Sequence, residues 1–429
     1  MKLKIPNRSS LIVMGLALLC MYVNNPFYIA KIEGVNKVLY YCFALLPLTG
    51  FLSMRIRIEF GLLTHVVYVL AYVFCAVIVI FVTSSYDIDY LIYLFRLLLN
   101  ISAMYSFCQI WKNNYEYDKV STHVGEIYII SLIIYIFGTI IFMILPNVKS
   151  IWMSVISLYG NLDLVLRAEY VSRFGFSGFA GYLVSFQTVS GIIYVAYLML
   201  TNMISMKRGS FYIIFLLIGC SFYGRTGLLA AMLVSFLFLF YYIFIKHHSN
   251  LLLYVLELFG LLSVLFAFLY HVSMGVFRRY IQWAFELFIT HQQHGKFTTS
   301  SLEEIKYFYK KFQPTIQVLL FGEGHWFDKD GGYYGGADVG FMRNIYYGGI
   351  IYTIILYGVV IIFLVLLNEK LKIKIKRGNR LLILLLLINM IIFELKGDVT
   401  FSFIKAYIPL YMGTYIHNEK ILKGNNNKI

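Results

Sequence analysis

Charged side chains are scarce in this chain of 429 residues, because Asp, Glu, Lys and Arg together make up only 13% of it. A soluble domain typically carries about 25% charged residues, so this composition excludes an ordinary soluble protein. The apolar fraction of 60% points the same way. The composition therefore indicates a membrane protein, in which each spanning helix uses about 20 predominantly apolar residues.

Acidic residues are the scarcer of the two charged classes, with 21 Asp and Glu against 36 Lys and Arg. In a soluble protein the resulting net charge of +15 could suggest a nucleic-acid partner. In a membrane protein we expect anionic lipid as the partner and no nucleic acid. There are only five cysteines, and all of them fall inside apolar runs. They predict small core residues and no disulfide or zinc framework.

Long apolar runs give the expected fold class, an all-α polytopic membrane protein that forms a single domain over residues 1–429. A single helix over 209–245 would be about 55 Å long, which exceeds the hydrocarbon core, so we expect a turn at Gly224-Arg225-Thr226-Gly227. About twelve transmembrane helices are then predicted, near residues 10–30, 38–54, 61–83, 90–111, 126–146, 179–203, 210–223, 227–245, 250–272, 346–367, 381–396 and 400–416.

The distribution of Lys and Arg predicts the orientation, because cytoplasmic loops retain positive charge. With both termini inside, the inner segments hold nineteen Lys and Arg. The four short outer loops hold only Lys31, Lys37, Arg225 and, at a boundary, Lys396. Both termini are therefore expected in the cytoplasm.

Two outer segments are long enough for chemistry outside the membrane, namely 147–178 and 273–345. In the larger one, the capping-box pattern from Ser301 to Glu304 precedes apolar residues at helical spacing. This pattern predicts a short amphipathic helix over 302–313.

Arginine is concentrated on the predicted outer face, which topology normally keeps poor in positive charge. A guanidinium group binds phosphate oxygens in a bidentate manner and stays charged, so converging arginines would suit a lipid-linked pyrophosphate or another polyanion. The alternative is that they extend to lipid headgroups. The six arginines are Arg167, Arg173, Arg225, Arg278, Arg279 and Arg343.

Other polar residues of the outer loops are candidates for proton transfer or sugar contact. Asp338 lies five residues before Arg343 at the entrance of the tenth predicted span, where the two residues could bind substrate or only pair with each other. Asp338, Glu323 and His325 are groups that can accept a proton from a hydroxyl. Aromatic residues such as Trp326, Tyr333 and Tyr334 could stack on sugars or lie at the headgroup level. No metal site is expected.

Several ionisable residues lie within the predicted spans, where they are costly unless they face protein or a water-filled cavity. Glu394, Lys396 and Asp398 lie at the outer end of the eleventh span. They could border the cleft in which the outer arginines converge, or they could form an internally paired cluster. The full set is Arg96, Glu257, Glu394, Lys396, Asp398 and Lys405.

The chain resembles the bacterial O-antigen and capsular polysaccharide polymerases of the Wzy type. The likeness covers the whole architecture of twelve spans, cytoplasmic termini and two long outer loops. Locally, Phe222-Tyr-Gly-Arg225-Thr-Gly-Leu-Leu is similar to the arginine-bearing hairpin of that superfamily, in which a Ser often precedes the Arg, where this chain has Gly224. The family patterns Arg-x10-Gly and Arg-x15-Gly match Arg167 with Gly178 and Arg279 with Gly295.

The resemblance implies glycosyl transfer at the periplasmic face of the bacterial inner membrane, with no metal and no cofactor. Its substrates would be two undecaprenyl-pyrophosphate-linked saccharides, as donor and acceptor, with a chain-length regulator and a flippase as further partners. Arg225, Arg279, Asp338 and His325 would then be catalytic. The substrate-binding residues would be Arg167, Arg173, Arg278, Arg343, Trp326 and Tyr333.

Two other functions remain open from the sequence. An O-antigen ligase, which transfers the glycan to lipid A-core, shares the architecture and the chemistry. A lipid-linked oligosaccharide flippase or another transporter would also suit twelve spans, but its polar residues are expected at mid-depth and not on one side.

Overall fold

The computed structural model of the chain describes residues 8–52, 60–114, 120–157, 173–247, 260, 286–296, 298–328, 332–336, 338–374 and 378–426. Within these ranges it has fifteen α-helices and one β-hairpin, which confirms a predominantly helical protein. The long helices are α1 (Arg8–Asn24), α2 (Glu33–Leu52), α3 (Phe60–Thr83), α4 (Ile88–Asn114), α5 (Val120–Ile144), α8 (Tyr182–Leu200), α9 (Met206–Tyr223), α10 (Arg225–Phe240), α16 (Gly340–Lys374), α17 (Asn379–Glu394) and α18 (Thr400–Asn426).

Short elements lie between the long helices. A hairpin of β1 (Phe174–Gly175) and β2 (Gly178–Phe179) pairs antiparallel just before α8. The short helices are η1 (Ala30–Ile32), α6 (Pro146–Val155), the π-helix η3 (Tyr241–Ile245), α13 (Glu286–His294), α14 (Ser300–Lys311), α15 (Ile316–Phe321) and η4 (Tyr334–Gly336).

Six helical segments in the described residues are long and apolar enough to cross a membrane. Helices occupy eleven of the twelve predicted apolar runs, and the remaining run, 250–272, lies outside the described residues except for Gly260. The count of twelve spans and their orientation therefore stay predictions. The six segments are Leu63–Thr83, Ile88–Trp111, Val124–Ile144, Tyr182–Leu200, Arg225–Ile245 and Gly340–Leu371.

The outward faces of these helices are apolar. Phe74 and Phe81 on α3 are 65% and 77% exposed, and Ile361 on α16 is 59% exposed. Scattered apolar residues are normal on a soluble protein, but rows of large side chains along whole helices mark a surface that contacts something apolar. Acyl chains of lipid fit this requirement.

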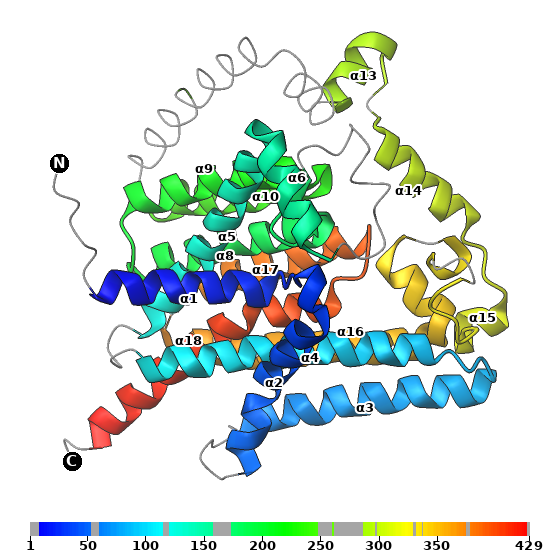
Figure 1. The fold of residues 1–429 in the computed structure, drawn as a ribbon, viewed down its shortest axis with the longest axis horizontal. Coiled ribbons are helices and arrows are strands. Elements are labelled where there is room, and N and C mark those ends of the chain that lie inside the picture. The colour runs from blue at the N-terminus through cyan, green and yellow to red at the C-terminus, as the bar shows by residue number, and fades with distance from the viewer. Residues whose placement is uncertain are drawn as a thin grey trace.

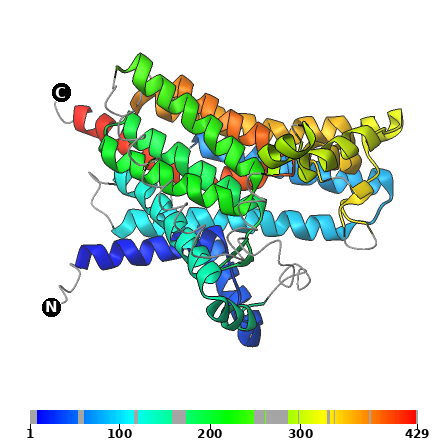
Figure 2. The same ribbon diagram turned by 90° about the horizontal axis from the view of Figure 1, so that it is seen from above.

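The helices form a bundle in which the start of α1 and the end of α18 lie at the same end (Figure 1). Figure 2, turned by 90°, shows the same arrangement, with α14 and α15 at the opposite end. We call this opposite end the distal end. The last turn of α1 and the first turns of α8 and α18 face this end and meet beside the middle of α4.

Helix α8 is the central helix of the bundle, in contact with α5, α9, α10, α17 and α18. Sixteen of its nineteen residues are buried, as expected for a helix that is apolar on all sides. Small residues allow its neighbours to approach closely: a Cβ atom added at Gly191 would lie 2.6 Å from Leu132 and 3.1 Å from Leu216.

The long apolar stretch 209–245 breaks at Gly224, which is the end of α9 and the residue before α10. This break lies at the first residue of the turn predicted from the sequence. It places Arg225 in the first turn of α10, where the backbone N–H groups lack helical partners.

The tenth predicted span begins later than its apolar run suggests. The stretch assigned to α16 contains a break at Gly349, whose φ of 73° is readily adopted only by glycine. A Cβ atom at this position would also collide with the backbone of Leu320 in α15. The segment 340–348 is therefore a separate short helix that packs near α15, and the spanning helix starts after Gly349.

Helix α14 covers the amphipathic segment expected at 302–313, but it begins earlier. Its N-cap is Thr299, whose side chain accepts a hydrogen bond of 3.2 Å from the Leu302 N–H. The side chain of Glu303 accepts a hydrogen bond from the hydroxyl of Thr298. The cap therefore lies two residues before the Ser301 of the predicted capping box.

Candidate functional site

Three basic side chains line one cavity at the distal ends of α8, α10 and α17. They are Arg173, Arg225 and Lys396, and we call them the basic cluster. The cavity has a volume of about 50 Å³, and its wall also includes Tyr182 and Ser185 from the first turn of α8. The cluster thus joins side chains that are up to 223 residues apart in the sequence.

Each member of the basic cluster is positioned by a local turn. Arg173 directly precedes the β-hairpin, and its carbonyl oxygen accepts a 2.6 Å hydrogen bond from the Ala180 N–H. The hairpin is fixed by the Ser177 and Tyr135 hydroxyls at 2.7 Å and by the Trp152 indole N–H, which donates to the Phe176 carbonyl at 3.0 Å. These contacts hold Arg173 beside the bundle.

Lys396 lies in the turn between α17 and α18. Its backbone N–H donates to the Phe393 carbonyl at 3.0 Å. Burial of the ammonium group, and after it the nearby Arg173 guanidinium, lower the pKa of Lys396. Arg225 also lowers it. Both arginines are therefore close enough to Lys396 to repel its charge, which Glu304 and Asp338 partly offset. An anion bound beside these cations would relieve the repulsion.

Arg225 already has an acidic partner in this structure. Its guanidinium forms an ion pair with the carboxylate of Glu286 in α13, and its Nη2 donates to the Ser300 hydroxyl at 3.1 Å. The Arg225 side chain is only 14% exposed. An anionic group from another part of the chain thus occupies one side of this guanidinium.

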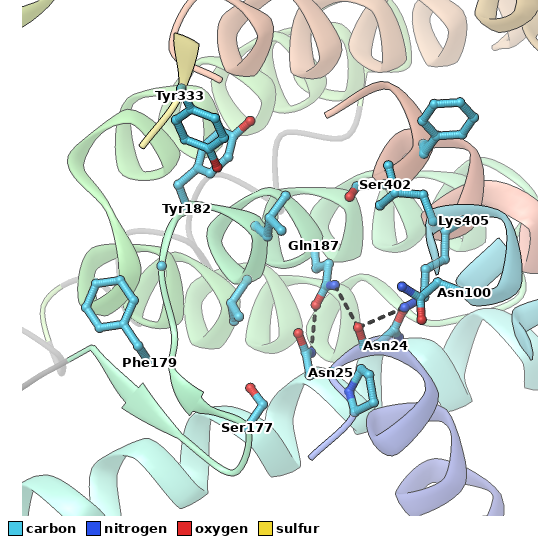
Figure 3. A pocket seen from close by; sticks show the side chains of 16 residues that line it. Asn24, Asn25, Asn100, Ser177, Phe179, Tyr182, Gln187, Tyr333, Ser402 and Lys405 are labelled. Carbon is cyan, nitrogen blue, oxygen red and sulfur yellow. Dashed lines mark hydrogen bonds between the residues drawn. The ribbon is translucent and has the colours of Figure 1, made fainter. Parts of the chain in front are cut away.

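A second, larger cavity lies next to the basic cluster (Figure 3). It has a volume of about 520 Å³ and lies between the distal ends of α1, α8 and α18 and the middle of α4. We call it the polar cavity. Its polar lining consists of Asn24, Asn25, Asn100, Ser177, Tyr182, Gln187, Tyr333, Ser402 and Lys405.

The carboxamides of the polar cavity form a connected network, drawn as dashed lines in Figure 3. Asn25 Nδ2 donates to Gln187 Oε1 at 2.7 Å, and Gln187 Nε2 donates to the Asn24 carbonyl at 3.2 Å. The Lys405 ammonium donates to the same carbonyl at 3.0 Å. The Oδ1 atom of Asn24 is buried and accepts no hydrogen bond from the described residues.

Tyr182 lines both cavities. Its hydroxyl is buried and has no hydrogen-bond partner in the described part of the chain. An unsatisfied buried hydroxyl costs roughly 1–3 kcal/mol, so a ligand that reaches this group would gain a hydrogen bond. Tyr182 therefore connects the basic cluster with the polar cavity.

Arg343 stacks on Tyr333, which lines the polar cavity. The Arg343 guanidinium carbon is 3.4 Å from the centre of the Tyr333 ring, which is close stacking, and Figure 3 shows Tyr333 beside Tyr182. Arg343 is 7% exposed. Its Nη2 donates to the Asp338 carbonyl at 2.7 Å and lies 3.7 Å from the Asp338 carboxylate. The predicted neighbours Asp338 and Arg343 thus pair with each other.

His325, Glu323 and Tyr334 form a separate group in the loop after α15. The ring of His325 lies 5.3 Å from that of Tyr334, whose hydroxyl donates to the Glu323 carboxylate. This hydrogen bond is the largest of the effects that raise the pKa of Tyr334 to about 12. The structure therefore brings these three predicted residues together.

Trp326 is placed in the core. It is 1% exposed, and its ring lies 4.4 Å from that of Tyr90. Its backbone N–H donates to the Asp87 carboxylate at 2.7 Å. These contacts anchor the loop after α15 to the start of α4 and leave no face of the indole ring to solvent.

The charged residues at the end of the eleventh span divide into two roles. Glu394 accepts hydrogen bonds from the Val399 N–H at 2.8 Å and the Thr400 hydroxyl at 3.1 Å, and Asp398 caps α18 through the Thr400 N–H. These two carboxylates hold the turn. Lys396 instead belongs to the basic cluster.

Three predicted arginines, Arg167, Arg278 and Arg279, lie outside the described residues. The sequence interpretation missed Glu286 and the carboxamides of the polar cavity. A usable signal existed for Asn24, Asn100 and Gln187, because each is a polar residue inside or at the end of an apolar run. For Lys405, the sequence indicates only an ionisable side chain inside a predicted span, where its charge is costly.

Two further findings concern metal binding and similarity to known proteins. In the part of the chain that the structure describes, no group of three or more His, Cys, Asp or Glu is arranged to hold a metal ion. No family model matches the chain, and no significant match to a curated protein or a solved structure is found.

Proposed function

We propose that this protein is a membrane glycosyltransferase that polymerises lipid-pyrophosphate-linked oligosaccharide repeat units into O-antigen or capsular polysaccharide. The observation that carries this proposal is the joining of the basic cluster and the polar cavity through Tyr182. One part suits a polyanion, and the other suits a group rich in hydroxyls. A glycan linked to a lipid pyrophosphate combines both.

The chemistry of the reaction matches these two parts. The acceptor hydroxyl oxygen forms a bond to the anomeric carbon of the donor, while the bond from that carbon to the pyrophosphate oxygen breaks. Negative charge develops on the leaving pyrophosphate, and preorganised guanidinium groups such as Arg173 and Arg225 stabilise it. The proton of the hydroxyl passes to a carboxylate or imidazole, for which Asp338 and His325 remain the candidates.

The ion pair of Arg225 with Glu286 supports an anion position at the basic cluster. A carboxylate is a smaller anion than a phosphate but presents oxygen atoms to the guanidinium in a similar way. In the proposed resting state Glu286 occupies this position, and the pyrophosphate replaces it when the donor binds.

The proposed orientation puts the distal end in the periplasm of a bacterial inner membrane. It rests on the excess of Lys and Arg in the loops on the other side. Lipid-linked donors are then within reach from the membrane, because the site lies at the ends of spanning helices.

The test of the proposed function uses purified full-length protein in nanodiscs with an undecaprenyl-pyrophosphate-linked repeat unit and no energy source. A ladder of longer lipid-linked products is expected on gels. No lengthening would overturn the proposal. A strain that lacks the protein should carry lipopolysaccharide with a single repeat unit, whereas a bare lipid A-core would indicate a ligase instead.

A further inference from the structure

Among the described residues that line the polar cavity, Lys405 is the one charged side chain, and its polar neighbours are neutral amides and hydroxyls. Lys405 is 7% exposed and lies in the second turn of α18. Its ammonium donates to the Asn24 backbone carbonyl at 3.0 Å, and no carboxylate of the described residues lies within ion-pair distance. None of the sixteen residues that line the cavity is acidic.

An ammonium group in this position is costly unless it is paired or solvated. A neutral ligand would leave the charge without compensation, whereas an anionic ligand would supply the missing partner. The other polar atoms of the wall are carboxamides and hydroxyls, which bind sugar hydroxyls as donors and acceptors. Asn24 Oδ1 and the Tyr182 hydroxyl are buried here without hydrogen bonds from the described residues.

We infer that the polar cavity binds a sugar that carries a carboxylate group, with Lys405 as its charged partner. The volume of about 520 Å³ is in the range of small-molecule sites and accommodates one or two sugar rings. Asn25 and Gln187, which are held by their mutual hydrogen bond, are positioned to bind the ring hydroxyls. This inference rests on the proposed function, since it specifies the sugar that the polymerase recognises.

The carboxylate is a better match to this cavity than the pyrophosphate of the lipid. A pyrophosphate carries several negative charges, and the basic cluster offers three cations for it. The described lining of the polar cavity offers one cation. Each cavity therefore binds a different part of the substrate: the basic cluster binds the pyrophosphate, and the polar cavity binds the acidic sugar at Lys405.

The experiment measures binding of small probes to the purified full-length protein in nanodiscs by saturation-transfer NMR. The probes are methyl glucuronide, methyl glucoside and acetate. We expect the glucuronide to bind about tenfold or more tightly than either of the others, because a charge-assisted hydrogen bond adds to those of the ring. Equal binding of glucuronide and glucoside would overturn the inference, and equal binding of acetate and glucuronide would show an anion site without sugar recognition, which also contradicts it.

Lys405→Met tests the assignment of the charge. The variant should bind glucuronide and glucoside equally, whereas Lys246→Met, which removes an exposed lysine at the other end of the bundle, should keep the preference of the wild type. A preference that persists in Lys405→Met would contradict the inference. These binding measurements do not depend on chain lengthening, so failure of the polymerase assay and failure of the sugar preference can be told apart.

Discussion

The basic cluster and the polar cavity share the side chain of Tyr182 but differ in the partners of their positively charged side chains. In the basic cluster, Arg225 is paired with the carboxylate of Glu286. In the polar cavity, Lys405 donates to a neutral carbonyl and forms no ion pair with the described residues. We therefore propose that the first region exchanges one anion for another, while the second receives its anion from a ligand.

The two regions also differ in their construction. The basic cluster is built from turns at the ends of helices and from the hairpin, which contribute residues from separate segments. The polar cavity is built mainly from residues inside α1, α4, α8 and α18. Sites on packed helices hold their geometry more precisely than sites on loops. We therefore expect selectivity to reside in the polar cavity and turnover in the basic cluster.

The largest expected effect comes from Arg225→Ala. Loss of one group that stabilises developing charge typically lowers a rate by about 10²–10³. Polymerisation by purified protein should fall by that factor, and Arg225→Lys should recover only part of it, because an ammonium cannot bind phosphate in a bidentate manner.

The matched control is Arg208→Ala. Arg208 pairs with Glu126 at 3.2 Å near the start of α9, at the opposite end of that helix from Arg225. Its loss should leave the rate of polymerisation within about twofold. Equal activity of the two alanine variants would remove Arg225 from the mechanism.

Gly227→Ala should perturb the wall of the basic cluster through packing, because Gly227 and Ser185 both line its cavity. A Cβ atom at Gly227 would collide with Ser185 of α8. Overpacking of this kind costs about 1–3 kcal/mol, so the midpoint of thermal unfolding should fall. Gly358→Ala is the control, because a Cβ atom there meets nothing within 4 Å. The double variant Gly227→Ala with Ser185→Gly should recover stability. If it does not, contact with Ser185 is not the cause of the destabilisation.

Glu286→Gln should sharpen the comparison by removing the competing carboxylate. We expect inorganic pyrophosphate to bind a few-fold more tightly to the variant, because it no longer has to displace a carboxylate from Arg225. Isothermal titration calorimetry at fixed salt measures this change. Glu303→Gln alters a carboxylate that pairs with Lys306 at 3.0 Å and should not affect pyrophosphate binding. Weaker binding in Glu286→Gln would contradict a competitive role.

The smallest effect concerns the loop of Tyr334. Its pKa is raised from the usual value near 10 to about 12, first by the hydrogen bond to Glu323. A raised pKa means that the folded protein retains the proton, so this contribution to stability is present below about pH 10 and is lost as the pH rises through 12. Tyrosine NMR with a ¹³Cζ label should show a lower pKa for this residue in Glu323→Gln, still above the usual value because burial also raises it. An unchanged titration in that variant would rule out this cause.

The helical architecture could be read from the sequence because hydropathy reports the cost of burying polar groups in lipid. A break within 209–245 followed from length, since one helix could not fill it, and the turn-forming Gly-Arg-Thr-Gly segment predicted its position at Gly224. The break at Gly349 was not predicted. It depends on the approach of α15, which is a tertiary contact that no local pattern reveals.

The candidate site was predictable in its cations and not in its neutral groups. Arg173 and Arg225 were expected to meet, because charge on the outer face is unusual. Lys396 was equally consistent with internal pairing, and only the fold of the turn assigns it to the basic cluster. Asn24, Asn100 and Gln187 carry no charge and lie far apart in sequence, so their convergence depends on helix packing.

The most direct test of the central claim is binding of undecaprenyl pyrophosphate to the full-length protein in nanodiscs, measured by native mass spectrometry. We predict one bound lipid in the wild type and in Arg208→Ala, with affinity reduced tenfold or more in Arg225→Ala and in Arg173→Ala. Equal affinity in all four proteins would contradict a pyrophosphate site at the basic cluster.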